Sequence, residues 1–233
     1  MKIFAKIKMI YAFIVTLIYL FMVLVSVAIF RKHDNQIKKF FSKLGLFLLG
    51  MKVKVEGIAD ENAQMLIVNH QSAMDINIIE TAYPYPLSWI AKKELFDIPV
   101  YGRIMDLTKS ISVERENKAG LVKLLKDAKI PLEEDRKLVI FPEGTRSKSR
   151  QMLKFKSGAK MVADKHKLKV QPVVILNSGN LFNISDFTQK SGQIKVVFLE
   201  SFEAQRDQDW LNTTREKMIE VYNNELANNP SYR

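Results

Sequence analysis

The sequence contains no cysteine and only three histidines, at positions 33, 70 and 166. The chain can therefore form no disulfide, no thiolate nucleophile and no cysteine-ligated zinc site. So few histidines also argue against a histidine-rich metal centre, and we expect no bound metal. The chain also lacks a Gly-x-Ser-x-Gly elbow, the motif that presents the nucleophilic serine of many hydrolases. These absences exclude several common kinds of catalytic site.

Acidic residues are outnumbered by basic ones, with 25 Asp and Glu against 36 Lys and Arg and a formal net charge of +11. Such a surface attracts anions, and nucleic acid and anionic lipid are the two obvious candidates. A length of 233 residues suits one α/β domain with an anchor and is short for two full domains. Because 47% of the residues are hydrophobic, the chain has enough apolar surface to fold.

Charged residues are absent from the stretch Met9–Phe30, which is mostly aliphatic and aromatic. As a helix this stretch would extend about 33 Å, which is enough to cross the hydrocarbon core of a bilayer. A cleaved signal peptide is the alternative, because Ser26-Val27-Ala28 resembles a small-residue cleavage site. However, the apolar run is longer than the roughly 7–15 residues usual in signal peptides, so we expect a retained anchor. Basic residues flank both ends and set no orientation, and the anchor either spans the bilayer or lies in one leaflet.

The segment after the anchor is basic and amphipathic. Its apolar residues recur at helical spacing: Ile37, Phe40, Phe41, Leu44 and Leu48. A basic amphipathic helix beside an anchor is typical of the membrane interface, where it faces anionic headgroups. The alternative is a core helix with a solvated basic edge, because the same apolar face suits core packing. We predict that residues 1–50 form membrane-anchoring helices, which disfavours a nucleic-acid-binding protein.

From about residue 51 the pattern changes to short apolar runs separated by helical stretches, and residues 51–233 form the second predicted unit. Strands alternating with helices predict an α/β fold with a mostly parallel central sheet flanked by helices. The expected strands are 52–56, 65–69, 88–91, 110–113, 138–141, 170–175 and 195–199. The expected helices include 75–81, 118–128, 158–166 and 209–227.

His70 follows the apolar run Met65–Val68, at the end of an expected strand, where open α/β sheets place their ligand sites. Asp75 comes five residues later, in the first turn of an expected helix. If the turn folds back, the Asp75 carboxylate accepts a hydrogen bond from one ring nitrogen of His70. The other ring nitrogen is then free to take a proton from a substrate hydroxyl, without any serine nucleophile. The alternative is a histidine with a satisfied local hydrogen bond, because this spacing alone is a weak signal.

The segment Phe-Pro-Glu-Gly-Thr-Arg-Ser at 141–147 follows a second expected buried strand. Gly144 permits a tight turn, and backbone N–H groups near Gly144 and Thr145 suit an anion-binding nest. Arg146 offers a rigid fork of donors for a phosphate. We expect Glu143 either to position Arg146 or to contact a glycerol hydroxyl. Taken alone, an exposed arginine on a β-turn is the simpler interpretation.

Two further expected strand ends carry cations, Lys92 and Lys93 at one and Arg115 at the other. Between Arg146 and Lys169 the chain holds nine basic residues and a single acidic one. Such runs are usually solvated surface, but this run begins inside the candidate anion site.

Together and in this order, these blocks resemble the glycerolipid acyltransferase family, in particular its bacterial 1-acyl-glycerol-3-phosphate acyltransferases. The resemblance covers about residues 51–200. One departure is Ser112-Val-Glu-Arg115, where many members have an Ile-Asp-Arg-like ending; the charges are kept. The matching blocks are the His-x4-Asp of His70 and Asp75, the stretch from Lys92 through Gly102 to Arg115, the segment 141–147, and Val170-Gln-Pro172-Val-Val.

The resemblance implies transfer of an acyl chain from acyl-ACP or acyl-CoA to the 2-hydroxyl of lysophosphatidic acid, giving phosphatidic acid for phospholipid synthesis. It implies no cofactor beyond the acyl donor and no covalent acyl-enzyme. His70 would be the general base and Asp75 its orienting partner. The substrate site would comprise Arg146, Arg115 and one of Lys92 and Lys93 as the phosphate grip, with Glu143, Gly144 and Thr145 beside them.

The thioester also needs an oxyanion donor, from the backbone near 142–144 or from the 70–75 turn. We expect the enzyme at the phospholipid surface of the inner membrane, with its active domain on the cytoplasmic side where acyl thioesters are found. Three alternatives remain open at this stage. The chain could act on another lysolipid, bind membrane lipid without catalysis, or use the His-Asp pair to activate water as a hydrolase.

Overall fold

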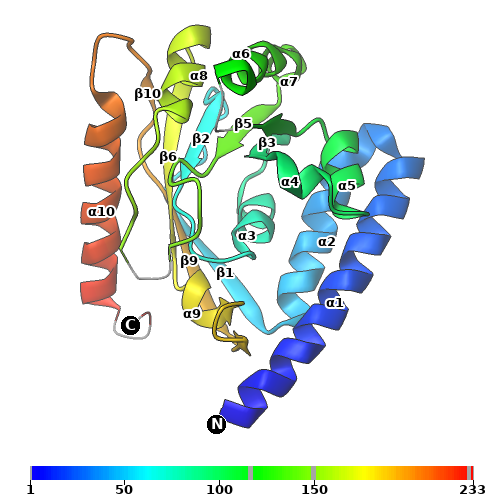
Figure 1. The fold of residues 1–233 in the computed structure, drawn as a ribbon. Helices are drawn as coiled ribbons and strands as arrows, with labels where there is room; N and C mark the ends of the chain where they lie inside the picture. The colour runs from blue at the N-terminus through cyan, green and yellow to red at the C-terminus, as the bar shows by residue number, and fades with distance from the viewer. Residues whose placement is uncertain (1, 115–117, 148–150, 230–231, 233) are drawn as a thin grey trace.

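The computed structural model describes residues 2–114, 118–147, 151–229 and 232, and its centre is an eight-stranded sheet (Figure 1). Seven strands follow the order β1–β9–β6–β2–β5–β3–β4, and β10 pairs with the first residues of β6. The main strands are β1 (Met51–Glu56), β2 (Met65–Val68), β3 (Leu87–Lys92), β4 (Ile111–Val113), β5 (Lys137–Ile140), β6 (Lys169–Leu176), β9 (Gly192–Phe198) and β10 (Phe202–Glu203). A separate short ladder joins β7 (Phe182–Asn183) to β8 (Thr188–Gln189).

The run from β6 through β2, β5 and β3 to β4 is parallel throughout, which confirms the predicted mostly parallel sheet. Strand β9 is antiparallel to β6, while β1 is parallel to β9. The chain passes from β6 to β9 through a short helix and the β7–β8 ladder. It has no long crossover helix there to restore the direction, so the strand runs back. The carboxyl ends of β2, β5, β3 and β4 consequently share one edge of the sheet.

Helices cover both faces of the sheet (Figure 1). On one face, α6, α8 and α10 bury an apolar cluster that includes Leu124, Val162 and Met218. On the other face, α3, α2 and part of α1 bury a second cluster that includes Ile78 and Leu46. The helices are α1 (Lys2–Ile29), α2 (Asp34–Leu48), α3 (Asp75–Ala82), α4 (Lys93–Phe96), α5 (Tyr101–Leu107), α6 (Lys118–Asp127), α7 (Lys129–Glu133), α8 (Gly158–His166), α9 (Ser178–Leu181) and α10 (Trp210–Asn228), with a 3-10 turn at Arg31–His33.

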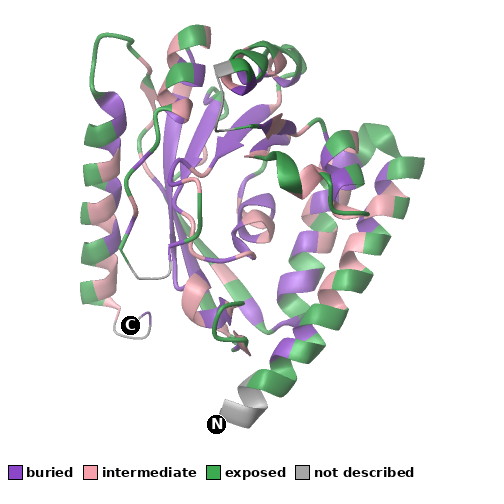
Figure 2. Cartoon of the chain, viewed as in Figure 1, coloured by how far each residue is buried: buried purple, intermediate pink, exposed green. Residues whose placement is uncertain are grey.

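Helices α1 and α2 form an antiparallel hairpin along the outside of the second helix layer (Figure 1). The segment Lys6–Ile29 of α1 is long and apolar enough to cross a membrane. Figure 2 shows that much of its outer surface is exposed, and this surface carries large apolar side chains such as Phe13, Leu17 and Phe21. The division into anchoring helices over 1–50 and a following domain stays a prediction, although α2 packs closely against α3.

Helix α2 buries three polar side chains and exposes two large aromatic ones. Its buried residues include Asp34, Lys38 and Ser42, whereas Phe40 and Phe47 are 61% and 76% exposed. Burying polar groups costs free energy unless they are hydrogen-bonded, and apolar residues normally turn away from water. If the outer face of α2 lies in an apolar medium, the exposed Phe40 and Phe47 are no longer in contact with water.

All seven strands expected from the sequence are present, with ends that differ by at most three residues. The short elements α4, α5, α7, α9, β7, β8 and β10 were not predicted. Each spans seven residues or fewer, which is too short for a periodic apolar pattern to distinguish helix from strand.

Candidate active site

His70 lies just beyond the carboxyl end of β2, whose four residues are fully buried. The preceding residue, Asn69, continues the strand pairing with its side chain: its amide donates to the carbonyl of Ile175 and accepts from the N–H of Ile175. These bonds, at 3.0 and 2.7 Å, hold the chain next to β6 immediately before His70. His70 therefore stands on a rigid strand end.

The turn after His70 folds back around the carboxylate of Asp75, as the sequence predicted. Oδ2 of Asp75 lies 2.8 Å from Nδ1 of His70, and it also accepts from the N–H groups of Gln71 and Ser72 at 2.7 and 2.8 Å. Because a carboxylate accepts only, Nδ1 carries the proton and Nε2 is left as a basic nitrogen. Asp75 is fully buried, so its orienting contact is sheltered from water.

The ring of His70 is also held by aromatic stacking. Its centroid lies 3.9 Å from that of Phe141, with only 10° between the planes. Phe141 in turn stacks on Trp89, at 5.5 Å and 29°. The hydrogen bond to Asp75 sets the rotation of the imidazole within its plane, and the stack sets the plane itself. Phe141 and Trp89 were not recognised as site residues from the sequence, because aromatic residues beside a strand are most often simple core.

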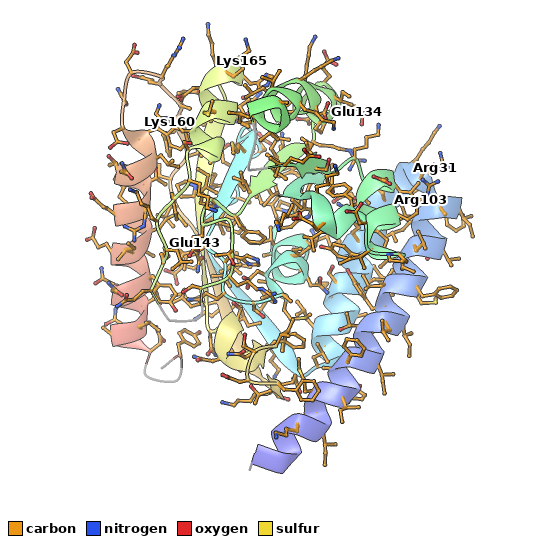
Figure 3. All side chains as sticks on the ribbon, viewed as in Figure 1. Arg31, Arg103, Glu134, Glu143, Lys160 and Lys165 are labelled. Atoms are coloured by element: carbon orange, nitrogen blue, oxygen red, sulfur yellow. The ribbon has the colours of Figure 1, made fainter. Side chains whose placement is uncertain are left out.

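Glu143 lies in the interior, whereas Arg31, Arg103 and Lys165 are at the periphery (Figure 3). It is 2% exposed, and its two carboxylate oxygens accept from the N–H groups of His70 and Leu153, at 2.8 and 2.7 Å. Burial raises the pKa of this carboxyl, while the two N–H donors oppose the rise. Glu143 thus joins the loop after β2 to the loop after β5; its predicted contact with substrate stays a prediction.

The loop after β5 turns at Gly144, which has a φ of +74°, a value that glycine adopts at little cost. The loop then runs back beside the first loop, where the N–H of Ser147 donates to the carbonyl of His70 at 2.8 Å. Thr145 and Arg146 are exposed at the tip. Arg146 is therefore free to reach a ligand at the same edge of the sheet as His70.

The remaining predicted cations lie on the neighbouring strand ends. Lys92 and Lys93 are exposed, and they form ion pairs with Glu94 and Glu114, respectively. The ion pair with Glu114 raises the pKa of Lys93, so this lysine stays charged at neutral pH. Arg115 lies outside the residues that the structure describes. The parallel order of the strands places Lys92 and Lys93, at the end of β3, along the same edge as His70.

A cavity of about 710 Å³ opens beside the loop after β5 and is bounded by β3, β4, α6 and α8. Ile90, Leu121, Ile140 and Phe155 give it an apolar lining, and Lys154 and Lys156 add basic groups. Its lining includes Phe141, Pro142 and Gly144, so the cavity adjoins the turn that follows the stacked phenylalanine. Such a space suits a flexible apolar chain with an anionic head.

Helix α10 contributes two contacts that the sequence did not predict. The guanidinium of Arg215 donates to the carbonyls of Leu153 and Met152, at 2.8 Å each, and the Gln71 side-chain amide donates to the hydroxyl of Tyr222 at 2.8 Å. The loops after β2 and β5 are therefore both tied to one helix at the far end of the sequence. No local pattern marks these residues, because their partners are 62 to 151 positions away. Among the described residues we find no cluster of His, Asp and Glu that is arranged for a metal ion.

Comparison of the sequence with known proteins finds a matching family and several relatives. A family model described as Acyltransferase matches residues 52–176. The chain is 41% identical over 177 residues to the 1-acyl-sn-glycerol-3-phosphate acyltransferase of Helicobacter pylori, covering 75% of each chain. A protein of the same name from Cocos nucifera is 29% identical over 167 residues, and the match spans 53% of its length.

The fold has a counterpart among crystal structures. The 1-acyl-sn-glycerophosphate (LPA) acyltransferase PlsC from Thermotoga maritima superposes with a TM-score of 0.78 over 98% of this chain and 97% of that one. The sequence identity in this match is 24%, so we take from it the fold and nothing further. Because the match includes nearly all of both chains, the two N-terminal helices belong to the shared architecture.

Proposed function

The chain belongs to the acyltransferase family, and from this premise we propose that it transfers an acyl chain from a thioester to the 2-hydroxyl of 1-acyl-glycerol-3-phosphate, making phosphatidic acid. The observation that carries the proposal is the His70–Asp75 pair, held at 2.8 Å beside an anion-suited loop and an apolar cavity. The names of the relatives specify the acceptor.

In the proposed reaction, Nε2 of His70 takes the proton of the acceptor hydroxyl as its oxygen attacks the thioester carbonyl. Asp75 stabilises the imidazolium that forms and keeps its ring in place. Collapse of the tetrahedral intermediate breaks the carbon–sulfur bond, and the imidazolium returns its proton to the departing thiolate. The products are the diacyl lipid and the free thiol of the donor, with no acyl-enzyme between them.

The intermediate needs a hydrogen-bond donor for its oxyanion. In the 70–75 turn, the N–H groups of His70, Gln71, Ser72, Met74 and Asp75 all donate to acceptors within the protein. Most N–H groups of this turn are therefore already used, and we assign the oxyanion donor to the loop after β5, to an N–H group of Glu143, Thr145 or Arg146. The same loop carries Arg146, which would hold the phosphate together with Arg115 and Lys92 or Lys93.

The proposed acyl-chain site is the cavity beside this loop, and its two lysines suit the phosphates of CoA or the acidic surface of a carrier protein. The acyl donor is thus acyl-ACP or acyl-CoA, and no cofactor is needed. Positioning the acceptor phosphate sets the hydroxyl next to His70, which supplies much of the rate gain.

We place the protein at the membrane through the α1–α2 hairpin. Met9 and Ala12, near the start of α1, are buried in the same cluster as Leu46, while Val23 and Val27, near its end, pack on Ile104 of α5. Both ends of α1 therefore contact one domain, whereas a helix that crossed the bilayer would leave one end on the far side. Helix α1 accordingly lies within one leaflet, on the cytoplasmic side of the inner membrane, where acyl thioesters are available.

The test is a purified assay in phospholipid vesicles that offers lysophosphatidic acid or other lysolipids with each thioester donor. His70→Ala should lower the rate of acyl transfer by about 10³-fold, because the general base is lost. His33→Ala, at an exposed histidine on the hairpin turn, is the matched control and should retain the wild-type rate.

Three outcomes would contradict the proposal. Wild-type turnover by the His70→Ala protein would remove the general-base mechanism. Release of free fatty acid without diacyl product would indicate a hydrolase. Lipid binding without turnover by the wild-type protein would indicate a non-catalytic lipid-binding protein.

A further inference from the structure

Lys38 lies on the inner face of α2 and is only 5% exposed, whereas Lys43 on the same helix is exposed. Its ammonium lies 3.0 Å from Oε1 of Glu80 and donates to the carbonyl of Leu87 at 3.2 Å. Removing two charges from water is costly, and an apolar pair of similar size often packs there with equal or better stability. The packing of α2 alone therefore does not explain this pair.

Glu80 belongs to α3, the helix that begins at the orienting residue Asp75. The same oxygen that meets Lys38 also accepts from the indole N–H of Trp89 at 2.8 Å. Glu80 is 4% exposed, so both contacts are shielded from solvent. One buried carboxylate thereby fixes the indole of Trp89 relative to the hairpin helix and to the catalytic helix.

Stacked rings connect the indole of Trp89 to the imidazole of His70. Trp89 stacks on Phe141 at 5.5 Å, and Phe141 stacks on the imidazole of His70 at 3.9 Å. Each ring limits the tilt of the next, because the contacts are face to face. An uninterrupted series of contacts thus runs from a side chain of α2 to the proposed general base.

We propose that Lys38 and Glu80 are positioning residues for the reaction, which hold the plane of the His70 imidazole through Trp89 and Phe141. This inference rests on the proposed acyl transfer. It makes α2 part of the support of the active site as well as a means of attachment to the membrane. A small tilt of the imidazole moves Nε2 away from the acceptor hydroxyl, and misplacement by about 1 Å can cost about 100-fold in rate.

A second buried ion pair provides the matched control. Asp34, four residues before Lys38 on α2, receives two hydrogen bonds from Arg136, at 2.8 and 2.7 Å. This pair also ties α2 to the domain, and its side chains are similarly buried, at 4% and 11% exposed. It has no aromatic link to His70 among the described residues. A purely structural role predicts equal effects from the two pairs.

The experiment measures kcat, KM and the unfolding midpoint in the vesicle assay. The double variant Lys38→Met with Glu80→Leu removes both charges and the acceptor for the indole; we expect kcat to fall about tenfold or more while KM changes less than about threefold. Lys38→Met with Glu80→Gln keeps an acceptor for Trp89 and should recover most of kcat. Asp34→Asn with Arg136→Met should lower the unfolding midpoint and leave kcat within about twofold.

Changing buried charges can prevent the protein from folding, so a further variant leaves Lys38 and Glu80 unchanged. Trp89→Phe keeps a ring in the stack but loses the bond to Glu80, and it should lower kcat as well. The inference would be overturned if Lys38→Met with Glu80→Leu had the same kcat as Asp34→Asn with Arg136→Met. An unchanged kcat in Trp89→Phe would overturn it as well. Wild-type protein without acyl transfer would instead overturn the proposed function, so the two failures can be distinguished.

Discussion

The α1–α2 hairpin and helix α10 lie on opposite sides of the sheet and present different surfaces to their surroundings. The hairpin layer exposes large apolar side chains along α1 and α2, including Phe21 and Phe47. On the other side, α10 shows polar residues outward, and none of its residues is an exposed large hydrophobic one. Since both layers bury apolar residues against the same sheet, the difference lies in the medium that each one faces. The hairpin layer suits lipid and the α10 layer suits water.

The two layers also hold the active site in different ways. From the hairpin side, Lys38 and Glu80 reach the ring of His70 through stacked aromatic residues. From the α10 side, Arg215 holds the loop whose N–H binds Glu143, and Glu143 binds the backbone N–H of His70. His70 is thus held at its ring from the hairpin side and at its backbone from the α10 side. Acyl transfer to a membrane lipid calls for such a site, set between the two media.

Charges placed on the outer face of the hairpin test this comparison most strongly. The double change Phe40→Glu with Phe47→Glu should abolish binding to anionic vesicles. Each phenylalanine inserted into the interface contributes roughly 1.5–3 kcal/mol, or about 10- to 100-fold in partitioning, and the added carboxylates are repelled. Vesicle flotation of the purified proteins measures the effect.

The control puts the same charge change on the other layer. Asn223→Glu with Asn224→Glu alters two exposed residues of α10 and should leave vesicle binding intact. If both double variants lost binding equally, net charge would be the cause, and the assignment of the hairpin face to lipid would fail.

A smaller effect is expected from the support on the water side. Arg215→Ala removes two hydrogen bonds to the loop at 152–153, so Glu143 is held less firmly against His70. We expect kcat to fall about tenfold, measured in the vesicle assay beside the unfolding midpoint. Arg206→Ala, at an exposed arginine before α10, makes the same charge change as a control. Identical kcat values for the two variants would show that the α10 layer does not support the site.

The smallest effect concerns an ion pair that belongs to neither layer. The hydrogen bond from Lys169, followed by one from Ser201, lowers the pKa of Asp60 to about 2. Because the folded pKa lies below the unfolded value of 3.8, the pair stabilises the fold above pH about 4 and is lost as pH falls toward about 2. Thermal unfolding of wild type and Asp60→Asn should differ by a few degrees at pH 7, differ less at pH 3, and converge only below pH about 2. A constant difference across this range would exclude the carboxylate as its source.

The prediction from sequence succeeded where a local pattern carries the information. The apolar runs before His70 and before Pro142 are β2 and β5, and the turn between His70 and Asp75 closes as expected. It did not foresee that both carboxylate oxygens of Glu143 accept hydrogen bonds from backbone N–H groups, because one donor, His70, lies 73 residues away. The burial of Lys38 was not foreseen either, because helical periodicity identifies the faces of a helix but not what covers them.

The sequence by itself determined the succession of strands and helices, the His-x4-Asp pair, the phosphate-suited loop and the apolar anchor. These features arise from neighbouring residues, whose spacing acts within one turn or one strand. Only the tertiary structure decided that α2 buries Asp34 and Lys38, that β9 runs against β6, and that α10 contacts the loops after β2 and β5. Such choices depend on contacts between residues far apart in the chain, and for α2 on the apolar medium outside. That is why the support of His70 appears only once the chain has folded.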